Sequence, residues 1–192
     1  MNFMKRLNRK FCVLTTKIQF GRKFKHIGKN SYIRKPIQID NPAGIEMYDA
    51  VAIGFGSWIY MDSSSSRLII RKNASIGNYS HIVVKEQILI DESVLIADKV
   101  FISDCSHIYE KIDIPIKNQG IEQLRPVHIG IGSWIGENVC IIGADVGKHC
   151  IIGANSVVLN SIPDYCVAAG CPAKVVKKYN QDIQKWVRVY ET

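Results

Sequence analysis

A repeat of about six residues runs from Val127 to Val158 and constrains the fold of this chain more than any other feature. The repeating aliphatic residues are Ile129, Ile135, Ile141, Val146, Ile152 and Val158. Glycine directly follows four of them, and a small or β-branched residue usually stands four positions later. Side chains repeat every ~3.6 residues on a helix and every ~2 residues on a strand, so neither element explains this period. Short-period self-similarity is typical of a solenoid, in which each coil stacks on the next.

The six-residue unit predicts a three-sided coil. One aliphatic side chain fills the narrow interior, and the adjacent glycine lets the backbone turn a corner that a Cβ would obstruct. Three units give a coil of roughly eighteen residues, and stacked coils lie about 4.8 Å apart. Earlier units contain Ile70, Ile76, Ile82, Ile90, Ile96 and Ile102, after an irregular first coil around Ile45, Val51 and Ile53. The alternative is a β-sandwich with many glycine turns, which the regular spacing disfavours.

Length and composition place the chain among single-domain proteins without a membrane span. It has 192 residues, of which 47% are hydrophobic, enough for an ample core. No apolar run approaches the ~20 residues of a transmembrane helix, and charged residues interrupt the N-terminus where a signal peptide would need an apolar segment. The six cysteines form no Cys-x-x-Cys pair, so we expect reduced thiols and a cytoplasmic location.

The positive charge of the chain is concentrated at its start. Net charge is +8, and residues 1–35 contain eleven Lys and Arg but no Asp or Glu. An anionic membrane surface or a phosphorylated small molecule would suit this charge, whereas no nucleic-acid-binding motif accompanies it. An apolar stripe with helical spacing predicts an amphipathic helix over residues 2–20. Its members are Phe3, Leu7, Phe11, Leu14 and Ile18. We favour a cap over the open end of the solenoid, and peripheral membrane contact is the alternative.

Breaks in the repeat define the expected organisation of the chain. Residues 1–44 form the basic helix and an extended lead-in, and residues 45–165 form the solenoid. The rhythm stops after Ile102 and resumes at Ile129, so we expect a loop ejected over residues 103–128, a length that is usually functional or disordered. Residues 166–192 should form a turn and a short helix around Trp186.

Three motifs within these coils resemble a known family. They are WIG at residues 134–136, IGANSVV at 152–158 and AAGCPAKVV at 168–176. The chain resembles the hexapeptide-repeat acyltransferases, in the branch of galactoside, maltose and xenobiotic acetyltransferases. Within that branch it looks most similar to O-acetyltransferases of surface-polysaccharide synthesis. The resemblance covers about residues 45–176 and implies an all-β solenoid, a left-handed parallel β-helix of hexapeptide repeats.

The resemblance also implies a catalytic histidine at the base of the ejected loop, a place that His107 occupies here. A neutral imidazole could take the proton of an attacking hydroxyl and then protonate the departing thiolate. Asp104 could orient the His107 ring, or it could be a solvated loop carboxylate. Cys105 stands where relatives often have histidine, and nothing nearby in the sequence would activate it as a nucleophile. His81 is a candidate sugar contact by loose alignment, whereas His128 and His149 look like ordinary surface residues.

For the acyl donor, the resemblance implies acetyl-CoA bound in a groove between neighbouring subunits of a homotrimer. Trp134 would line the groove, although a core position is the alternative, and the small Gly136 and Ala154 would let the pantetheine arm approach the backbone. Lys174 and Lys177 would face the coenzyme phosphates, unless they belong to a solvated basic tail. Asn160 stands where many relatives have lysine, which puts one phosphate contact in doubt.

These features predict an acetyl-CoA-dependent O-acetyltransferase that acts on a sugar hydroxyl by direct transfer. N-acetylation of a nucleotide-linked amino sugar is the main alternative, because the histidine serves either acceptor. Two alternative hypotheses lie outside the acyltransferases: a non-catalytic solenoid scaffold and a γ-type carbonic anhydrase. The latter needs three imidazoles around zinc, and residues 108–127 contain no histidine. No metal cofactor is expected.

Overall fold

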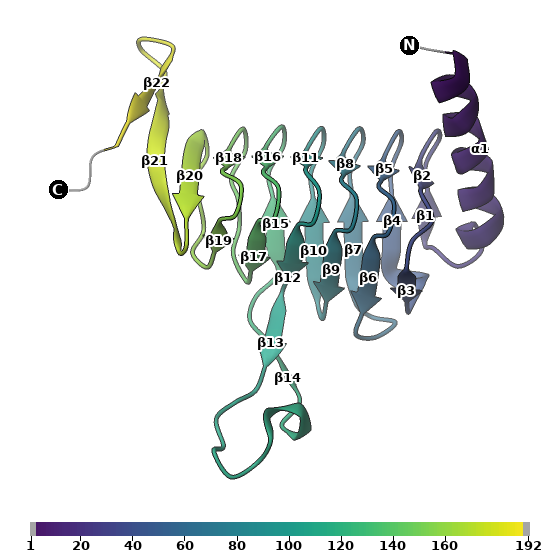
Figure 1. Ribbon diagram of the computed structural model, residues 1–192, viewed down its shortest axis with the longest axis horizontal. Helices are drawn as coiled ribbons and strands as arrows, with labels where there is room; N and C mark the ends of the chain where they lie inside the picture. Colours follow the sequence, from purple (N-terminus) through teal and green to yellow (C-terminus); the bar gives the residue numbers. More distant parts are fainter. Residues whose placement is uncertain (1–2, 190–192) are drawn as a thin grey trace.

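The computed structural model describes residues 3–189, and its body is a parallel β-helix whose three flat sides are β-sheets (Figure 1). Sheet A contains β1 (His26–Ile27), β4 (Ile45–Met47), β7 (Arg67–Ile70), β10 (Gln87–Ile90) and β15 (Val127–Ile129). The parallel part of sheet B contains β2 (Tyr32–Ile33), β5 (Ala52–Ile53), β8 (Ser75–Ile76), β11 (Leu95–Ile96), β16 (Trp134–Ile135), β18 (Ile151–Ile152) and β20 (Cys166–Gly170). Sheet C contains β3 (Gln38–Asp40), β6 (Trp58–Met61), β9 (His81–Val84), β12 (Phe101–Ser103), β17 (Cys140–Ile142) and β19 (Val157–Val158). The chain therefore visits the sheets in the repeating order A, B, C.

The predicted aliphatic positions form the core of the solenoid. In sheet B the strand register places the inward residues of successive coils directly above one another: Ile53, Ile76, Ile96, Ile135 and Ile152. Each of these side chains is at most 2% exposed. The small residues expected inside the corners are buried as well, and Ser133 there donates a hydrogen bond to the Gly147 carbonyl at 2.7 Å. The hexad pattern thus predicts both the inward residues and their stacking.

Glycine beside the inward aliphatic has a different purpose from the one expected. A Cβ on Gly136 would lie 2.7 Å from the backbone nitrogen of Ala154 in the next coil, and one on Gly77 would lie 2.4 Å from Ala97. Neither glycine has a positive φ. The left-handed corner position falls two residues later, as at Asn138 (φ 57°), a residue type that tolerates this conformation. Glycine is therefore needed for the close approach of coils, and the residue two places on makes the turn.

The start of the solenoid differs from the prediction. The first coil begins at β1 rather than near Ile45, because Ile27, Ile33 and Ile39 already repeat every six residues. After a 3₁₀ turn, η1 (Pro42–Gly44), the second coil begins at β4.

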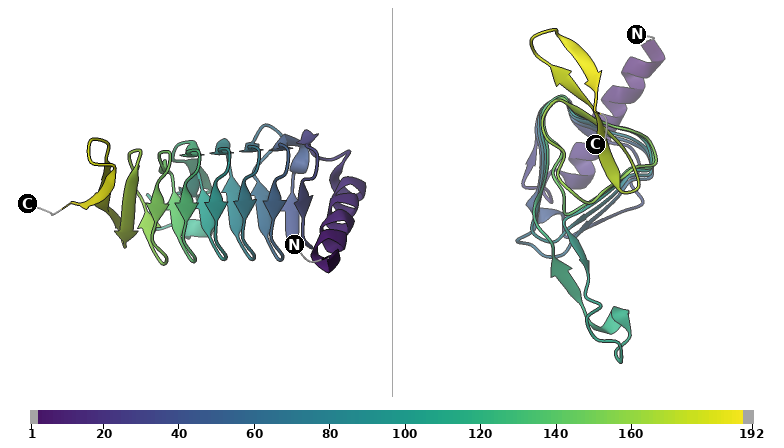
Figure 2. Two further views of the ribbon diagram at one scale, coloured as in Figure 1. Left: turned by 90° about the horizontal axis from the view of Figure 1, so that it is seen from above. Right: turned by 90° about the vertical axis from the view of Figure 1, so that its left-hand side faces the viewer.

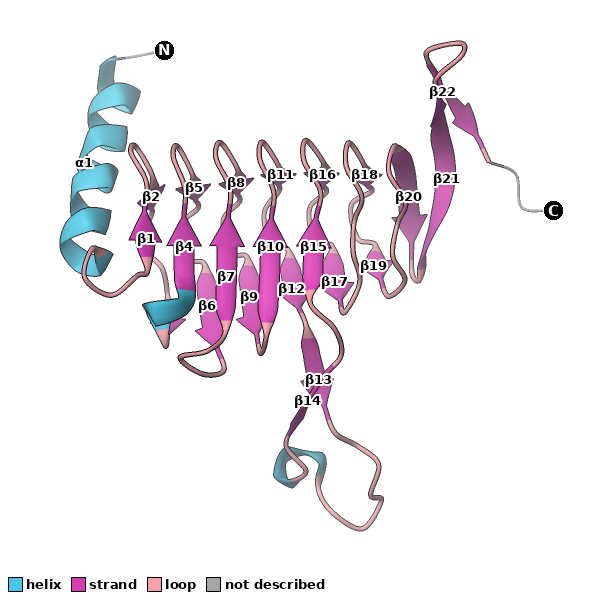
Figure 3. Cartoon of the chain, turned by 180° about the vertical axis from the view of Figure 1, so that it is seen from behind, coloured by secondary structure: helices cyan, strands magenta, loops and turns pink. Residues whose placement is uncertain are grey.

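The C-terminal segment is a β-hairpin, so the predicted helix around Trp186 is wrong. Strand β21 (Ala173–Asn180) pairs antiparallel with β20, and β22 (Lys185–Arg188) pairs antiparallel with β21. Val175 and Tyr179 are half-buried among exposed lysines, and pairing of β21 with β20 satisfies the backbone groups at the edge of sheet B. The Trp186 ring lies edge-on to Tyr179, with ring centroids 5.4 Å apart. Figure 3 shows this hairpin at the end of the solenoid opposite the helix.

The predicted N-terminal helix is confirmed as α1 (Phe3–Phe20), which lies across the first coil (Figures 1 and 2). It caps the solenoid, but with a face other than the predicted apolar stripe. Thr16 and Phe20 face the core, and the Thr16 hydroxyl accepts a hydrogen bond from the Ile33 amide at 2.9 Å. Within the described residues, no helix is long and apolar enough to cross a membrane.

The ejected loop is an ordered arm that leaves the solenoid between β12 of sheet C and β15 of sheet A. Strands β13 (Cys105–His107) and β14 (Ile121–Gln123) pair antiparallel, and η2 (Ile116–Asn118) lies near the tip. Gln119 holds the tip together, since its amide nitrogen donates to the carbonyls of Lys111 and Ile114 at 2.7 and 2.8 Å. Figure 2 shows the arm extending well away from the triangular body.

Candidate active site

His107 lies at the end of β13, where the arm leaves the solenoid, and its side chain is exposed. The strand pairing sets it opposite Ile121, and the next residue, Ile108, donates its amide to the Gly120 carbonyl at 3.1 Å. The imidazole is therefore carried by a hydrogen-bonded ribbon rather than by a loose loop. Among the described residues, none hydrogen-bonds to the ring, so both nitrogens can reach a ligand. This geometry suits a group that accepts and donates protons.

Asp104 has a structural contact in place of the predicted one with His107. Its carboxylate is fully buried and accepts hydrogen bonds from three backbone amides at 2.7–2.8 Å, those of Lys85, Glu86 and Gln87. Both carboxylate oxygens are thereby directed to the corner between β9 and β10. Such charge-assisted bonds to backbone amides are strong and fix local geometry. We therefore assign Asp104 to holding the corner from which the arm starts.

Cys105 is buried beside Ser103, with its Sγ 3.5 Å from the Ser103 hydroxyl. Burial raises the pKa of the Cys105 thiol, while the Ser103 hydroxyl lowers it less strongly. A thiol with a raised pKa is protonated at neutral pH and is a poor nucleophile. The structure thus agrees with the sequence argument against covalent catalysis by this cysteine.

His81 lies on the outer face of sheet C, in a ladder of aromatic side chains that the sequence reasoning missed. Its ring stacks on Trp58 with centroids 4.4 Å apart and contacts Phe101 at 5.3 Å. Burial lowers the pKa of His81, so the ring is neutral at pH 7. Its Nε2 is buried and has no hydrogen-bond partner among the described residues. The sequence does indicate this ladder, because each of the three aromatic residues directly precedes an inward isoleucine of the repeat.

Trp134 and Lys177 share one outward-facing column of sheet B. Ladder pairs connect Trp134 to Ile151, Ile151 to Val167, and Val167 to Lys177. Three strand spacings separate the two ends, or about 14 Å. The indole is 49% exposed, which excludes the alternative of a core-filling tryptophan. An exposed indole and a cation thus lie on the same face of the solenoid.

The remaining predicted donor-binding residues lie around the C-terminal coils. Ala154, Asn160 and Lys174 are exposed, and Lys174 pairs across the ladder with Ala169. Gly136 is buried against the next coil, so its small size is already required by coil stacking. Ala154, unlike Gly136, is therefore accessible to solvent at this corner.

One chain does not bring the predicted catalytic and donor-binding residues together. The arm with His107 starts at the corner between sheets C and A, whereas Trp134 and Lys177 lie on sheet B. In a three-sided coil, sheet B is the face opposite that corner. The end-on view in Figure 2 shows the arm and the C-terminal hairpin on opposite sides of the triangle. A site containing all these residues would need two chains.

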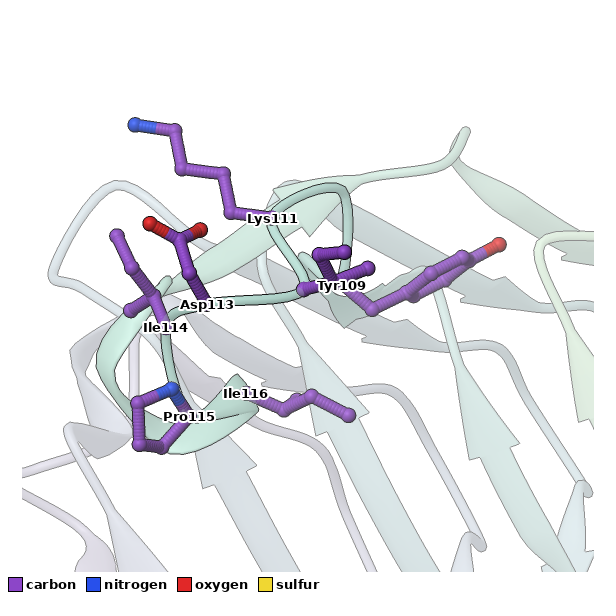
Figure 4. A pocket seen from close by; sticks show the side chains of 7 residues that line it. Tyr109, Lys111, Asp113, Ile114, Pro115 and Ile116 are labelled. Carbon is purple, nitrogen blue, oxygen red and sulfur yellow. The ribbon is translucent and has the colours of Figure 1, made fainter.

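A shallow hollow of about 490 Å³ lies at the tip of the arm, away from His107. Its lining consists of Tyr109, Lys111, Ile112, Asp113, Ile114, Pro115 and Ile116. Figure 4 shows Lys111 and Tyr109 pointing away from one another, so the polar groups do not converge on a ligand. Ile112 is fully exposed, and Tyr109 is 65% exposed. An exposed apolar tip of this kind is better suited to contact another surface than to bind a small molecule.

Metal chemistry has no ready site in the described part of the chain. Across residues 3–189, no group of three His, Cys, Asp or Glu side chains could hold a metal ion. A zinc enzyme of the carbonic anhydrase type requires three such ligands.

Comparison with known proteins shows relatives along most of the chain, although no protein-family model matches. The putative lipopolysaccharide biosynthesis O-acetyl transferase of Escherichia coli K12 is 36% identical over 162 residues, which cover 80% of this chain and 82% of that protein. A probable acetyltransferase of Mycobacterium tuberculosis is 36% identical over 150 residues, covering 70% of this chain. The match spans only 48%, about half, of the mycobacterial protein.

Solved structures share the fold. An N-acyltransferase from Bacillus cereus, in complex with dTDP and coenzyme A, has a TM-score of 0.73 and 21% identity, covering 89% of this chain and 91% of that chain. A maltose O-acetyltransferase from Clostridium difficile has a TM-score of 0.58 and 26% identity, covering 94% and 90%. A hexapeptide-repeat acetyltransferase from Vibrio cholerae, in complex with acetyl-CoA, has a TM-score of 0.62 and 20% identity, covering 88% and 78%.

Proposed function

The chain belongs to the hexapeptide-repeat acyltransferases, which share the left-handed parallel β-helix, and from this we propose that it transfers an acetyl group from acetyl-CoA to a sugar hydroxyl. The Escherichia coli relative is named as a lipopolysaccharide O-acetyl transferase and the clostridial structure as a maltose O-acetyltransferase. Synthesis of a surface polysaccharide or lipopolysaccharide is the process we propose. We also propose that the reaction takes place in the cytoplasm.

The single observation that carries this proposal is the position of His107, exposed on an ordered ribbon at the base of the arm. A sugar hydroxyl is a weak nucleophile at pH 7 until its proton is removed. The imidazole takes that proton as the sugar oxygen forms a bond to the thioester carbonyl carbon. The carbon–sulfur bond then breaks, and the imidazolium returns the proton to the coenzyme A thiolate. No covalent enzyme intermediate is needed, which fits the protonated state of Cys105.

The donor would lie along the outward face of sheet B. We propose that the exposed Trp134 packs on the pantetheine arm and that Ala154 lets this arm approach the backbone. Lys177 and Lys174 would pair with the phosphates as point charges. Asn160 would add a hydrogen bond without charge, and the buried Gly136 would support the corner on which the donor rests.

A homotrimer is the assembly we propose, because it would complete the site. His107 and Trp134 lie on opposite sides of one chain, and a cyclic arrangement places the arm of one protomer against sheet B of the next. The exposed apolar tip of the arm supports this contact, with Ile112 and Tyr109 available to pack on the neighbouring chain. Each site would then use His107 from one chain and the donor-binding face of another.

The acceptor that we propose is a saccharide. The ladder of Trp58, His81 and Phe101 is suited to contact a saccharide, since sugar C–H groups pack on aromatic rings and Trp58 is 39% exposed. The alternative is N-acylation of an amino sugar linked to a nucleotide. It is favoured by the Bacillus cereus structure, an N-acyltransferase in complex with dTDP.

The first test is calorimetric titration of acetyl-CoA into the wild-type chain and into His107→Ala, with His128→Ala as the matched control. His128 is an exposed histidine of sheet A that pairs with Asp91. We expect saturable binding in all three proteins, and turnover lost only in His107→Ala with a panel of sugars and nucleotide-linked amino sugars. Absence of binding at millimolar acetyl-CoA would overturn the proposal.

A further inference from the structure

The capping helix α1 has two opposite faces of different character. One face packs on the first coil through Thr16 and Phe20, which are 1% and 6% exposed. The Thr16 hydroxyl also donates a hydrogen bond to the Cys12 carbonyl at 2.8 Å, so it satisfies groups of both the helix and the coil. Capping of the solenoid therefore uses this face alone.

The opposite face carries the apolar stripe and covers nothing in the described chain. Its members Leu7, Phe11, Leu14 and Ile18 are between 55% and 76% exposed. At about 100° per residue, these four side chains lie within an arc of about 60°, and Thr16 lies on the other side of the helix. The side chain of Phe3, which the spacing adds to the stripe, lies outside the described part of the structure. Single exposed apolar residues are ordinary, but a continuous row of four marks a surface that another body covers.

Cations flank this row, and acidic residues are absent from the sequence around it. Lys10 and Lys17 are exposed and lie about 70–90° from the centre of the row, both on the same side. The turn after the helix and the first coil, on which the helix rests, add further exposed cations: Arg22, Lys23, Lys29, Arg34 and Lys35. The first acidic residue of the chain is Asp40. This end of the molecule therefore has both apolar and strongly basic character.

We propose that this end of the solenoid docks on an anionic lipid surface through the outward face of α1. An interfacial helix buries its apolar row ~5–10 Å into the boundary between headgroups and acyl chains, while flanking Lys and Arg pair with anionic headgroups. An interfacial helix lies in the plane of the membrane and does not have to span it, so the 18 residues of α1 are sufficient. A second copy of this chain is a poorer occupant, because a symmetric contact would bring two sets of cations together.

The position of α1 also determines the orientation that the protein would have on the membrane. Figure 1 shows α1 lying across the end of the solenoid, so its outward face looks along the long axis of the body. A membrane bound there would leave the three sheets extending away from the lipid plane, and the arm, which projects across the long axis, would run roughly parallel to that plane. The inference does not depend on the proposed reaction, because neither His107 nor the donor-binding face takes part in docking.

The test is co-sedimentation of the full chain with phosphatidylcholine vesicles, with and without ~30% phosphatidylglycerol. Deletion of α1 is unsuitable, because it would expose Ile33 and the first coil. The variant is therefore Leu14→Gln/Ile18→Gln, with two exposed positions changed and every charge kept. The matched control is Ile183→Gln, also exposed at 56% but located in the turn between β21 and β22 at the far end.

We expect the wild-type chain and the Ile183 control to bind anionic vesicles, with binding to neutral vesicles far weaker. The stripe variant should bind about tenfold or more weakly, since two apolar side chains no longer enter the lipid. Lys10→Gln/Lys17→Gln should weaken binding and reduce its sensitivity to salt. Unfolding temperature and acetyl-CoA titration should be unchanged in every variant, which separates this test from that of the proposed function.

Two results would overturn the proposal. One is equal binding of the wild type and the stripe variant to anionic vesicles, or no binding by either. The other is a smaller assembly of the stripe variant in sedimentation velocity, which would show that the row contacts another copy of the chain.

Discussion

In the wall of the solenoid, formed by sheets A, B and C, the register fixes the surroundings of each side chain, whereas the arm exposes most of its side chains over residues 107–120. Inward isoleucines of the wall stack in columns and are nearly inaccessible. The arm holds its shape through the β13–β14 pairing and the Gln119 hydrogen bonds, and it exposes His107 and Ile112. The residues that stabilise the fold and the residue proposed for catalysis therefore lie in different parts of the molecule. Substitutions in the two regions should therefore have different consequences.

The largest effect is expected at the arm. His107→Ala should lower kcat by about 10²–10⁴, because a positioned general base contributes that much. Its unfolding temperature should equal that of the wild type, since the side chain is exposed on the ribbon. Steady-state kinetics and thermal unfolding measure both. A decrease in kcat of the same size in His128→Ala, or a decrease below tenfold in His107→Ala, would remove His107 from the chemistry.

In the wall, we expect a substitution of an inward residue to lower the stability of the fold. Ile96→Ala removes a side chain stacked between Ile76 and Ile135, and we expect a loss of about 2–5 kcal/mol in the free energy of unfolding. Leu95→Ala, at the neighbouring exposed position, should cost less than about 1 kcal/mol. Urea unfolding measures both values. Similar losses for the two variants would mean that the inward and outward assignment is wrong.

A pH-dependent effect on stability is expected in the wall, at Cys150. Burial raises the pKa of Cys150 to about 11 from an ordinary value near 9. The folded state therefore holds this proton more tightly, so its stabilising effect is complete below pH 9 and is lost as pH rises towards 11. A shift of two units corresponds to about 2–3 kcal/mol.

Cys150→Ala should consequently lose less stability than the wild type between pH 8 and pH 10.5. Cys171→Ala, at an exposed cysteine, should follow the wild-type curve. Urea unfolding across this pH range measures the slopes. Parallel curves for the wild type and Cys150→Ala would show that this thiol does not contribute to alkaline unfolding.

The smallest expected effect lies where the arm joins the wall. Asp104→Asn weakens the three amide hydrogen bonds and should cost about 1–3 kcal/mol of unfolding free energy. The pH profile of kcat should keep its shape, since the carboxylate does not contact His107. Asp113→Asn, at the exposed tip of the arm, is the control and should leave stability unchanged. A shifted kinetic pKa in Asp104→Asn alone would restore the predicted pairing of Asp104 with His107.

The sequence predicted the wall well because each hexad repeats one physical environment. Ile96 and Ile135 could be placed in one column from spacing alone. The first coil was missed because Lys and Arg around Ile27 and Ile33 made the segment look like an irregular lead-in, although those charges only point outward. The C-terminal hairpin was not predicted, because β21 and β22 lie beyond the six-residue repeat and do not carry its pattern.

The site was harder to predict than the wall. Asp104 lies close to His107 in sequence, yet its partners are the amides of Lys85, Glu86 and Gln87, some 18 residues earlier and one coil away. Strand alternation and coil stacking decide such contacts, and local spacing does not show them. The aromatic neighbours of His81 also come from other coils. Contacts between coils follow from register, which must be known to within one residue.

The measurement that tests the central claim most directly is complementation between two inactive variants, His107→Ala and Trp134→Ala/Lys177→Ala. The two chains are refolded together with acetyl-CoA and a sugar that the wild type acetylates, and thiol release is measured. If each site combines the arm of one chain with sheet B of another, random assembly should restore about a quarter of the wild-type rate. The two variants assembled separately and then combined should stay inactive. A co-refolded mixture as inactive as its components would contradict the shared site and place the whole reaction within one chain.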